Sequence, residues 1–227
     1  MTQGAQAGKG RPDRRPTALA VADFFPWPPR SGGQLRTSIA VEALAEEADV
    51  DLFSFRDLRS PEAAAPEHVG LRRVATAGYP QIDRSGRWRI PWLLPGRPPV
   101  PMEVAMRAAD AGPRSAFASF LATDAGERRP GQANGSGDPY DLVWFARPSV
   151  WEWLGRPRLG PTIVDLHDLE SDKERRRAEL MEPSGRGVRS RLRHEVARAQ
   201  ARLNARRWRG FELSVAAAVD RVLLASD

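Results

Sequence analysis

Short apolar runs alternate with amphipathic stretches along most of this chain. The run "TALAVADFF" at 17–25 lies between prolines and has the length of a buried parallel strand. After Gly32-Gly33, apolar residues recur at helical spacing, and "VDLFSF" at 50–55 then alternates as a strand does. The helical apolar positions are Leu35, Ile39, Val41, Ala43, Leu44 and Ala48. The pattern predicts a β-α-β unit with the usual right-handed crossover between parallel strands.

The same alternation continues to the end of the sequence. Further strands are predicted at 71–78, 140–146, 161–170 and 221–225, with helices at 102–122, around 150–153 and within 171–208. The last helical region contains "PSGRG" at 183–187, which predicts two helices with a hinge. Strands that alternate with helices predict an α/β fold, a Rossmann-like doubly wound parallel sheet. Ligands of such sheets bind in the crevice outside the carboxyl ends of the strands.

Length and composition favour a single domain without disulfide bonds. The chain has 227 residues, 41% of them hydrophobic, which is enough for one substantial core. It contains no cysteine, which excludes disulfides, thiolate metal sites and cysteine nucleophiles. Residues 1–16 lack the apolar segment of a signal peptide and predict a disordered polar tail. No later apolar run reaches the roughly 20 residues of a spanning helix, so we expect a cytoplasmic protein with one domain at 17–227.

Arginine dominates the charge of the chain. The formal net charge is +6 and the pI is about 10.7, which favours an anionic partner, although the codon composition of a GC-rich genome can produce the same excess. The densest stretch, 173–209, holds Lys173 and twelve arginines against four glutamates. Either these are solvated helices, or the arginines dock on anionic lipid. We do not expect a nucleic-acid partner, because no recognition module accompanies them.

Two other stretches have compositions that argue against regular structure. The segment 83–101 is punctuated by proline and glycine yet carries two tryptophans and two leucines. Its apolar side chains either cover the open edge of the core or form a lip for an apolar substrate or a bilayer. The low-complexity stretch 124–139 predicts a surface insertion.

The glycine pair Gly32-Gly33 stands where a strand gives way to a helix. Glycine permits close approach of a phosphate to the backbone amides of a helix N-terminus, but a tight turn would use the same residues. Arg30 and Arg36 flank the turn and could add charge-assisted contacts to phosphate. The dinucleotide fingerprint G-x-G-x-x-G is missing there, which argues against an NAD-dependent enzyme.

His167 and Asp168 follow a predicted strand at its carboxyl end. Imidazole suits a hydrogen bond to a substrate hydroxyl, although a single histidine near a core is often structural. Asp168 could orient His167 or bind acceptor hydroxyls, or else cap the helix that follows. The chain has no G-x-S-x-G nucleophile elbow, and His68, His167 and His194 lack the spacing of zinc ligands, so we expect no metal site.

Five segments, in order from Thr17 to Asp227, resemble the N-terminal half of family 4 glycosyltransferases of the two-domain GT-B architecture, especially bacterial sugar transferases. They are "PPRSGGQLR", "RPPVP", "YDLVWFARP", "IVDLHDLES" and "RWRGFELSVAAAVDRVLLASD". The resemblance implies that Gly32 and Gly33 lie near the donor diphosphate. It also implies that His167 lies against the transferred sugar and that no metal or other cofactor is essential.

The resemblance implies transfer of a sugar from a nucleotide-sugar donor to a saccharide or lipid-linked acceptor. In that family the N-terminal domain holds the acceptor, and a C-terminal domain, which has no counterpart in this sequence, grips the donor. We therefore expect a separately encoded C-terminal half as a partner and a peripheral position on the inner face of the membrane. The alternative is a non-catalytic module that binds a saccharide, lipid or nucleic acid, or a truncated inactive fragment.

Overall fold

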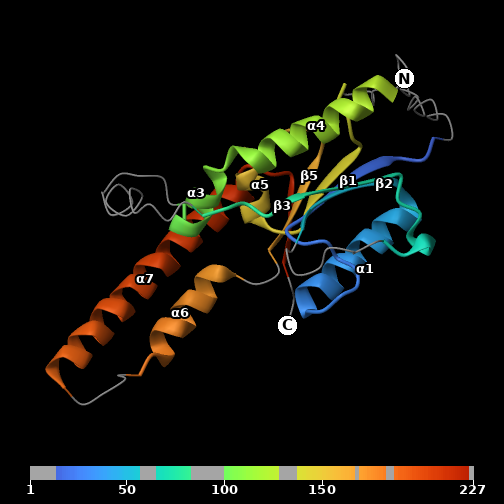
Figure 1. The fold of residues 1–227 in the computed structure, drawn as a ribbon. Coiled ribbons are helices and arrows are strands. Elements are labelled where there is room, and N and C mark those ends of the chain that lie inside the picture. The colour runs from blue at the N-terminus through green and yellow to red at the C-terminus, as the bar shows by residue number, and fades with distance from the viewer. Residues whose placement is uncertain are drawn as a thin grey trace, which may run out of the picture.

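A computed structural model describes residues 14–56, 65–82, 100–127, 137–166, 169–182 and 187–224 (Figure 1). Several expectations concern residues outside these ranges. They are the first thirteen residues of the polar tail, nearly all of the tryptophan-containing segment 83–101, most of the insertion 124–139, and both His167 and Asp168.

The six described strands form one parallel sheet. They are β1 (Thr17–Ala22), β2 (Asp49–Arg56), β3 (Arg73–Gly78), β4 (Leu142–Phe145), β5 (Thr162–Leu166) and β6 (Arg221–Leu224). Their spatial order is β3-β2-β1-β4-β5-β6, and every neighbouring pair is parallel. In register, Ala18 of β1 lies between Val50 of β2 and Leu142 of β4. This confirms the predicted Rossmann-like doubly wound sheet, whose strand order reverses between β1 and β4.

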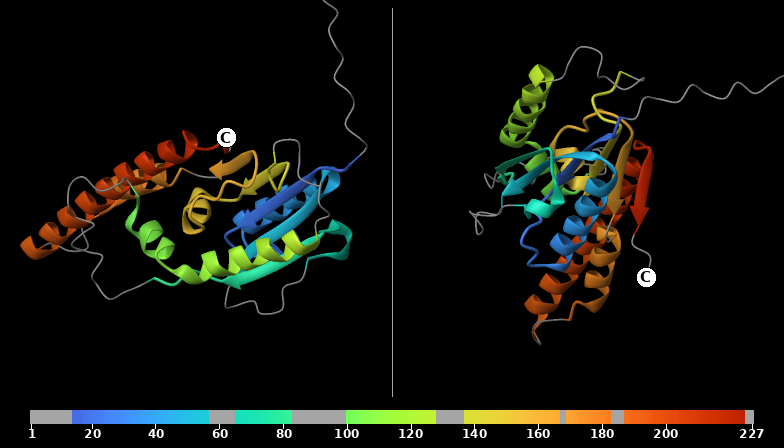
Figure 2. Two further views of the ribbon diagram at one scale, coloured as in Figure 1. Left: turned by 90° about the horizontal axis from the view of Figure 1, so that it is seen from above. Right: turned by 90° about the vertical axis from the view of Figure 1, so that its right-hand side faces the viewer.

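Helices cover both faces of the sheet (Figures 1 and 2). One face is covered by α1 (Gly32–Glu47). The other is covered by α3 (Met102–Ala108), α4 (Ala111–Glu127), α5 (Pro148–Trp153) and the C-terminal part of α7 (Val188–Ala216). A short 3-10 turn, Glu67–Val69, precedes β3. The helix α6 (Glu170–Leu180) pairs with the N-terminal part of α7 to form a hairpin that projects away from the sheet.

The buried side of α1 differs from the one that its hydrophobic pattern predicts. Leu35 and Ile39 are 49% and 56% exposed, whereas Thr37, Ser38 and Val41 are buried. The reason lies in β1, whose side chains toward α1 are all alanines: Ala18, Ala20 and Ala22. Small residues on both elements let the helix pack closely on the strand, and the larger Leu35 and Ile39 remain outside.

Several predicted element boundaries differ from those in the structure. The helix predicted at 102–122 is divided between α3 and α4, because Asp110 accepts hydrogen bonds from the amides of Gly112 (3.0 Å) and Gln81 (2.9 Å). The strand predicted at 161–170 ends at Leu166, and α6 begins at Glu170. The two predicted helices after it are confirmed, although α7 continues eight residues past Trp208 to Ala216.

Candidate functional site

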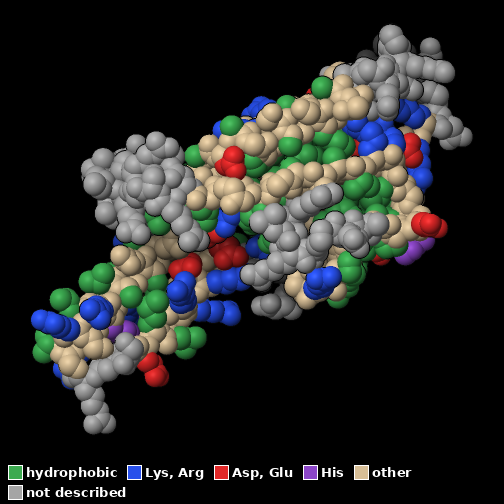
Figure 3. Space-filling view, viewed as in Figure 1, with side chains coloured by type: hydrophobic (Ala, Val, Ile, Leu, Met, Phe, Trp, Pro, Cys, Tyr) green, Lys and Arg blue, Asp and Glu red, His purple; other side chains and the backbone are tan. Residues whose placement is uncertain are grey.

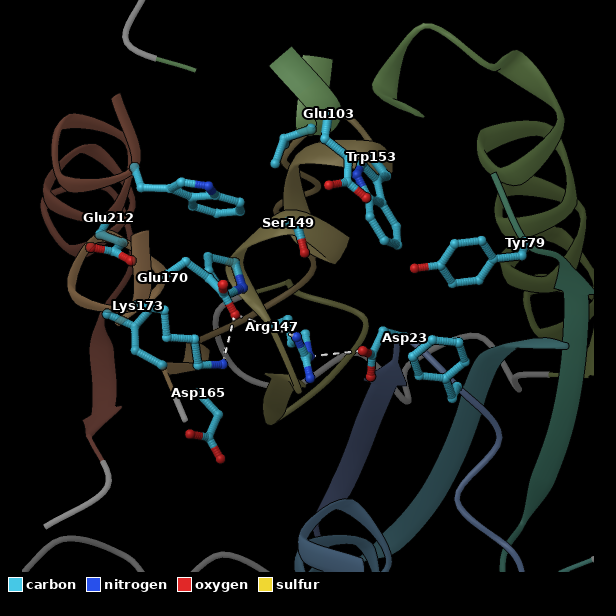
Figure 4. A pocket seen from close by; sticks show the side chains of 15 residues that line it. Asp23, Tyr79, Glu103, Arg147, Ser149, Trp153, Asp165, Glu170, Lys173 and Glu212 are labelled. Atoms are coloured by element: carbon cyan, nitrogen blue, oxygen red, sulfur yellow. Dashed lines mark hydrogen bonds and ion pairs between the residues drawn. The ribbon is translucent and has the colours of Figure 1, made fainter. Parts of the chain in front are cut away.

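A pocket of about 270 Å³ lies at the carboxyl edge of the sheet (Figure 4). Its walls come from residues that follow β1, β3 and β4, from the end of β5, and from the four helices α3, α5, α6 and α7. The lining residues are Asp23, Phe24, Tyr79, Glu103, Val104, Arg147, Pro148, Ser149, Trp153, Asp165, Leu166, Glu170, Lys173, Trp208 and Glu212. The pocket therefore occupies the place where doubly wound sheets bind their ligands.

Arg147 is the central charge of the pocket. It follows β4, and its Nε lies 2.7 Å from a carboxylate oxygen of Asp23, which follows β1. Its Nη1 lies 3.9 Å from Glu170 at the start of α6. The Arg147–Asp23 pair thus bridges the two central strands at the point where the strand order reverses. The side chain of Arg147 remains 38% exposed, so a ligand can reach its guanidinium group.

An aromatic wall faces this charge. The ring of Tyr79 stacks on Phe24 with centroids 5.2 Å apart, and it meets Trp153 edge to face at 5.5 Å. The guanidinium of Arg107 lies 4.7 Å from the Tyr79 centroid, on which it makes a cation–π contact. Burial raises the pKa of Tyr79, although Arg107 opposes the shift, so the phenol stays protonated at neutral pH. Figure 4 shows its hydroxyl directed toward the interior of the pocket.

The opposite wall joins α6 to α7. Glu212 of α7 is buried and accepts hydrogen bonds from the Ser171 hydroxyl (2.6 Å) and the Ser171 amide (3.2 Å). It therefore caps the first turn of α6, which has no cap from its own sequence. Burial raises the pKa of Glu212, partly offset by the bonds from Ser171. Beside it, Lys173 pairs with Glu170 at 3.0 Å.

The glycine pair adjoins the pocket at the start of α1. Neither Gly32 nor Gly33 has a positive φ. A Cβ on Gly32 would meet no atom within 4 Å, and one on Gly33 would meet the Arg147 guanidinium at an ordinary 3.7 Å. Their amides have no acceptor among the described residues, whereas the next amide, Gln34, donates to the hydroxyl of Ser31. The turn does not require glycine at either position, so a tight turn does not explain why both residues are glycine.

Arg36 lies in the second turn of α1 and holds a buried carboxylate. Its Nη2 and Nε donate to the two oxygens of Asp165 at 3.1 and 3.3 Å. Asp165 is 3% exposed and lines the pocket, so Arg36 supports the pocket wall through Asp165. Its contact with a phosphate stays a prediction.

The structure brings three of the five predicted site residues to one region. Gly32, Gly33 and Arg36 lie next to the pocket, while His167 and Asp168 lie outside the described residues. Sequence reasoning missed Arg147, Tyr79 and Trp153. A signal was available for Arg147, which lies two residues after Phe145 at the end of the strand "LVWF" and so had to stand at the carboxyl edge. No cluster of three potential metal ligands occurs in the described ranges.

Comparison with known proteins does not extend this picture. The chain matches no protein-family model and no curated protein sequence. None of the helices in the described part of the chain has the length and apolar character needed to cross a bilayer. Fold and site define a class only: a Rossmann-like, all-parallel α/β protein with a charged and aromatic pocket at the reversal point of its strand order.

Proposed function

We propose that this domain is the acceptor-side half of a glycosyltransferase that moves a sugar from a nucleotide-sugar to a saccharide or lipid-linked acceptor. A donor-binding domain would complete the active site. The observation that carries the proposal is the glycine pair beside Arg147. The turn does not require glycine at position 32 or 33. The Gly32 and Gly33 amides have no acceptor among the described residues, and the space beside them opens toward the accessible guanidinium of Arg147. That combination suits the diphosphate of a nucleotide-sugar.

The pocket has the chemistry for a sugar acceptor. Phe24, Tyr79 and Trp153 give the pocket an apolar aromatic wall, and carboxylates such as Asp23 accept hydrogen bonds from sugar hydroxyls. The protonated Tyr79 hydroxyl adds a donor. A volume of about 270 Å³ is close to the lower end for ligand sites, which fits one or two sugar rings.

In the transfer, the bond between the anomeric carbon and the diphosphate oxygen breaks while the acceptor oxygen bonds to that carbon. The acceptor's proton passes to the departing diphosphate or to solvent. The negative charge that develops on the diphosphate would be stabilised by the Gly32 and Gly33 amides and by Arg147. Asp23, 2.7 Å from Arg147, is placed to orient the guanidinium. His167, which the sequence resemblance sets against the transferred sugar, remains the candidate for a hydrogen bond to that sugar.

Calorimetric titration with nucleotide-sugars, followed by transfer assays with and without a C-terminal donor-binding domain, tests the proposal. Gly33→Val should weaken nucleotide-sugar binding at least tenfold, because its side chain would fill the space between the free amides and Arg147. Gly187→Val is the matched control, since Gly187 also has open space around it and lies at the start of α7. Equal affinity for wild type and Gly33→Val would contradict a diphosphate site at α1. Saccharide binding without turnover under every condition would support the non-catalytic module.

A further inference from the structure

The N-terminal part of α7 carries an apolar stripe that faces solvent. Val188, Leu192 and Val196 are 82%, 65% and 50% exposed, and Leu203 lies on the same side. At 100° per residue, these four positions fall within an arc of about 80°. The opposite side of the helix holds the buried Ala201, and Arg198 donates from its flank to the Ala178 carbonyl of α6. The stripe therefore faces away from the helix with which α7 is paired.

Arginines flank this stripe on both sides. Arg189 and Arg193 lie along one side, Arg191, Arg202 and Arg209 along the other, and Arg206 lies at its edge. In the described part of the chain, none of these six has a carboxylate partner. Figure 3 shows hydrophobic and basic side chains gathered together on this projection.

The paired helix α6 shows that the arrangement is particular to α7. Three of the four basic residues of α6 pair with carboxylates of the same helix: Lys173 with Glu170, Arg175 with Asp172 and Arg177 with Glu174. By contrast, α7 has eight arginines against two glutamates, and one of those, Glu212, is buried. The unneutralised charge is therefore concentrated on the helix that also exposes the apolar stripe.

We propose that α7 docks on an anionic lipid surface, with the Val188–Leu203 stripe in the interfacial region and the flanking arginines on the lipid phosphates. A helix with an apolar face bordered by arginines is the form that lies in a membrane interface. The stripe lies on a hairpin that projects away from the sheet, so a bilayer can reach it along its length. The flanking arginines, which have no carboxylate partner among the described residues, match the charge of anionic lipid phosphates. Long arginine side chains keep their charge at the headgroups while their stems follow the apolar residues. This proposal stands independently of the function proposed for the pocket.

Flotation of the full chain with vesicles tests the proposal directly. We expect binding to vesicles of phosphatidylcholine with 30% phosphatidylglycerol, little binding to phosphatidylcholine alone, and weaker binding as salt rises. Leu192→Ser/Val196→Ser should lower the partition coefficient at least tenfold, and Arg189→Gln or Arg193→Gln about fivefold each. Since all these side chains are exposed, the variants should fold as the wild type does.

Matched controls distinguish this surface from general stickiness. Ile39→Ser removes an equally exposed apolar side chain on α1, and Arg158→Gln removes an exposed arginine outside the hairpin. Neither should change vesicle binding. Three results would overturn the proposal. The first two are no binding to anionic vesicles, and a loss of vesicle binding in the controls equal to that in the stripe variants. The third is vesicle binding that depends on the arginines but not on Leu192 and Val196, which would indicate a general affinity for polyanions. A dimer in lipid-free solution that Leu192→Ser/Val196→Ser dissociates would identify a second copy as the occupant and would also overturn it.

Discussion

The two edges of the sheet both contain arginine–aspartate pairs, but they use them differently. At the amino edge, Asp51 is fully buried and bonds to Arg72, to Arg73 at 2.6 Å and to the Tyr140 hydroxyl at 2.8 Å. At the carboxyl edge, Arg147 and Asp23 pair beside a pocket, and the Arg147 side chain stays 38% exposed. The first cluster is closed by protein groups alone, whereas the second leaves space and donors for a ligand.

The difference shows that a buried charge does not by itself mark a functional site. Burial alone would raise the pKa of Asp51, but the bonds from Arg72, Arg73 and Tyr140 outweigh it and leave that pKa below its ordinary value. Such a perturbed group would be a site candidate if it lay in a cleft. Here the carboxylate is fully buried and accepts bonds from Arg72, Arg73 and Tyr140, so the perturbation reflects folding.

The largest effect that we predict is on stability, from substitution of Asp51 in the buried cluster at the amino edge. Asp51→Asn should lower the free energy of unfolding by about 3–5 kcal/mol, because two partly buried guanidinium groups lose their counter-charge. Urea denaturation at pH 7 measures it. Tyr140→Phe should cost less, about 1–2 kcal/mol, because it removes the bond that the hydroxyl donates to Asp51 and the bond that it accepts from Arg73. If Asp51→Asn were neutral, the cluster would not be a stabilising unit. The depressed pKa also predicts that its contribution is present above about pH 4 and is lost as the pH falls through the folded-state pKa.

The matching change at the open edge should affect ligand binding more than stability. Arg147→Met should weaken nucleotide-sugar binding by about 10–100-fold, the loss expected for a charged hydrogen bond. Its effect on unfolding should be smaller than that of Asp51→Asn, because Arg147 is partly solvated. Titration calorimetry and urea denaturation of the same sample separate the two effects. Arg158→Met, outside the pocket, is the control. If Arg147→Met lost much stability but kept its affinity for nucleotide-sugars, the arginine–aspartate pairs at both edges would be structural.

Substitution of glycine by alanine sharpens the comparison at the level of the backbone. Gly33→Ala should raise the free energy of unfolding by about 0.4–1 kcal/mol, because its Cβ meets only ordinary contacts within a helix. Gly160→Ala should destabilise, since its Cβ would come 2.3 Å from the Tyr140 carbonyl at a φ of 149°. Thermal unfolding followed by circular dichroism compares the pair. A destabilising Gly33→Ala would restore a structural reason for that glycine.

The smallest predicted effect concerns Glu212. Burial raises the pKa of Glu212 in the folded state above its unfolded value of 4.5. The resulting stabilisation is fully present below pH 4.5 and is lost as the pH rises through the folded-state pKa. Glu212→Gln should remove that dependence and change stability at pH 7 by about 1 kcal/mol or less. Urea denaturation between pH 4 and pH 8 provides the measurement. An unchanged pH profile in Glu212→Gln would assign the dependence to other groups.

The strand pattern predicted the sheet because parallel strands are buried on both faces and read as apolar runs with turns between them. The buried side of α1 was not predictable in this way, since the alanines of β1 that select it belong to a different element. The same holds for the pocket. Glycine and histidine at strand ends are visible in a sequence, but Tyr79 and Trp153 meet only when the chain folds, and Asp51 finds Tyr140 across 89 residues.

One continuous helix, α7, joins the pocket to the proposed lipid-docking stripe. Trp208 and Glu212 line the pocket, and Val188 lies twenty residues away from Trp208 on the same helix, about 30 Å at 1.5 Å per residue. A tilt of α7 by about ten degrees around its pocket end would move Val188 through about 5 Å, the rise of one helical turn. The helix is therefore a lever arm, in which a small angular change beside a ligand becomes a large linear displacement at the tip.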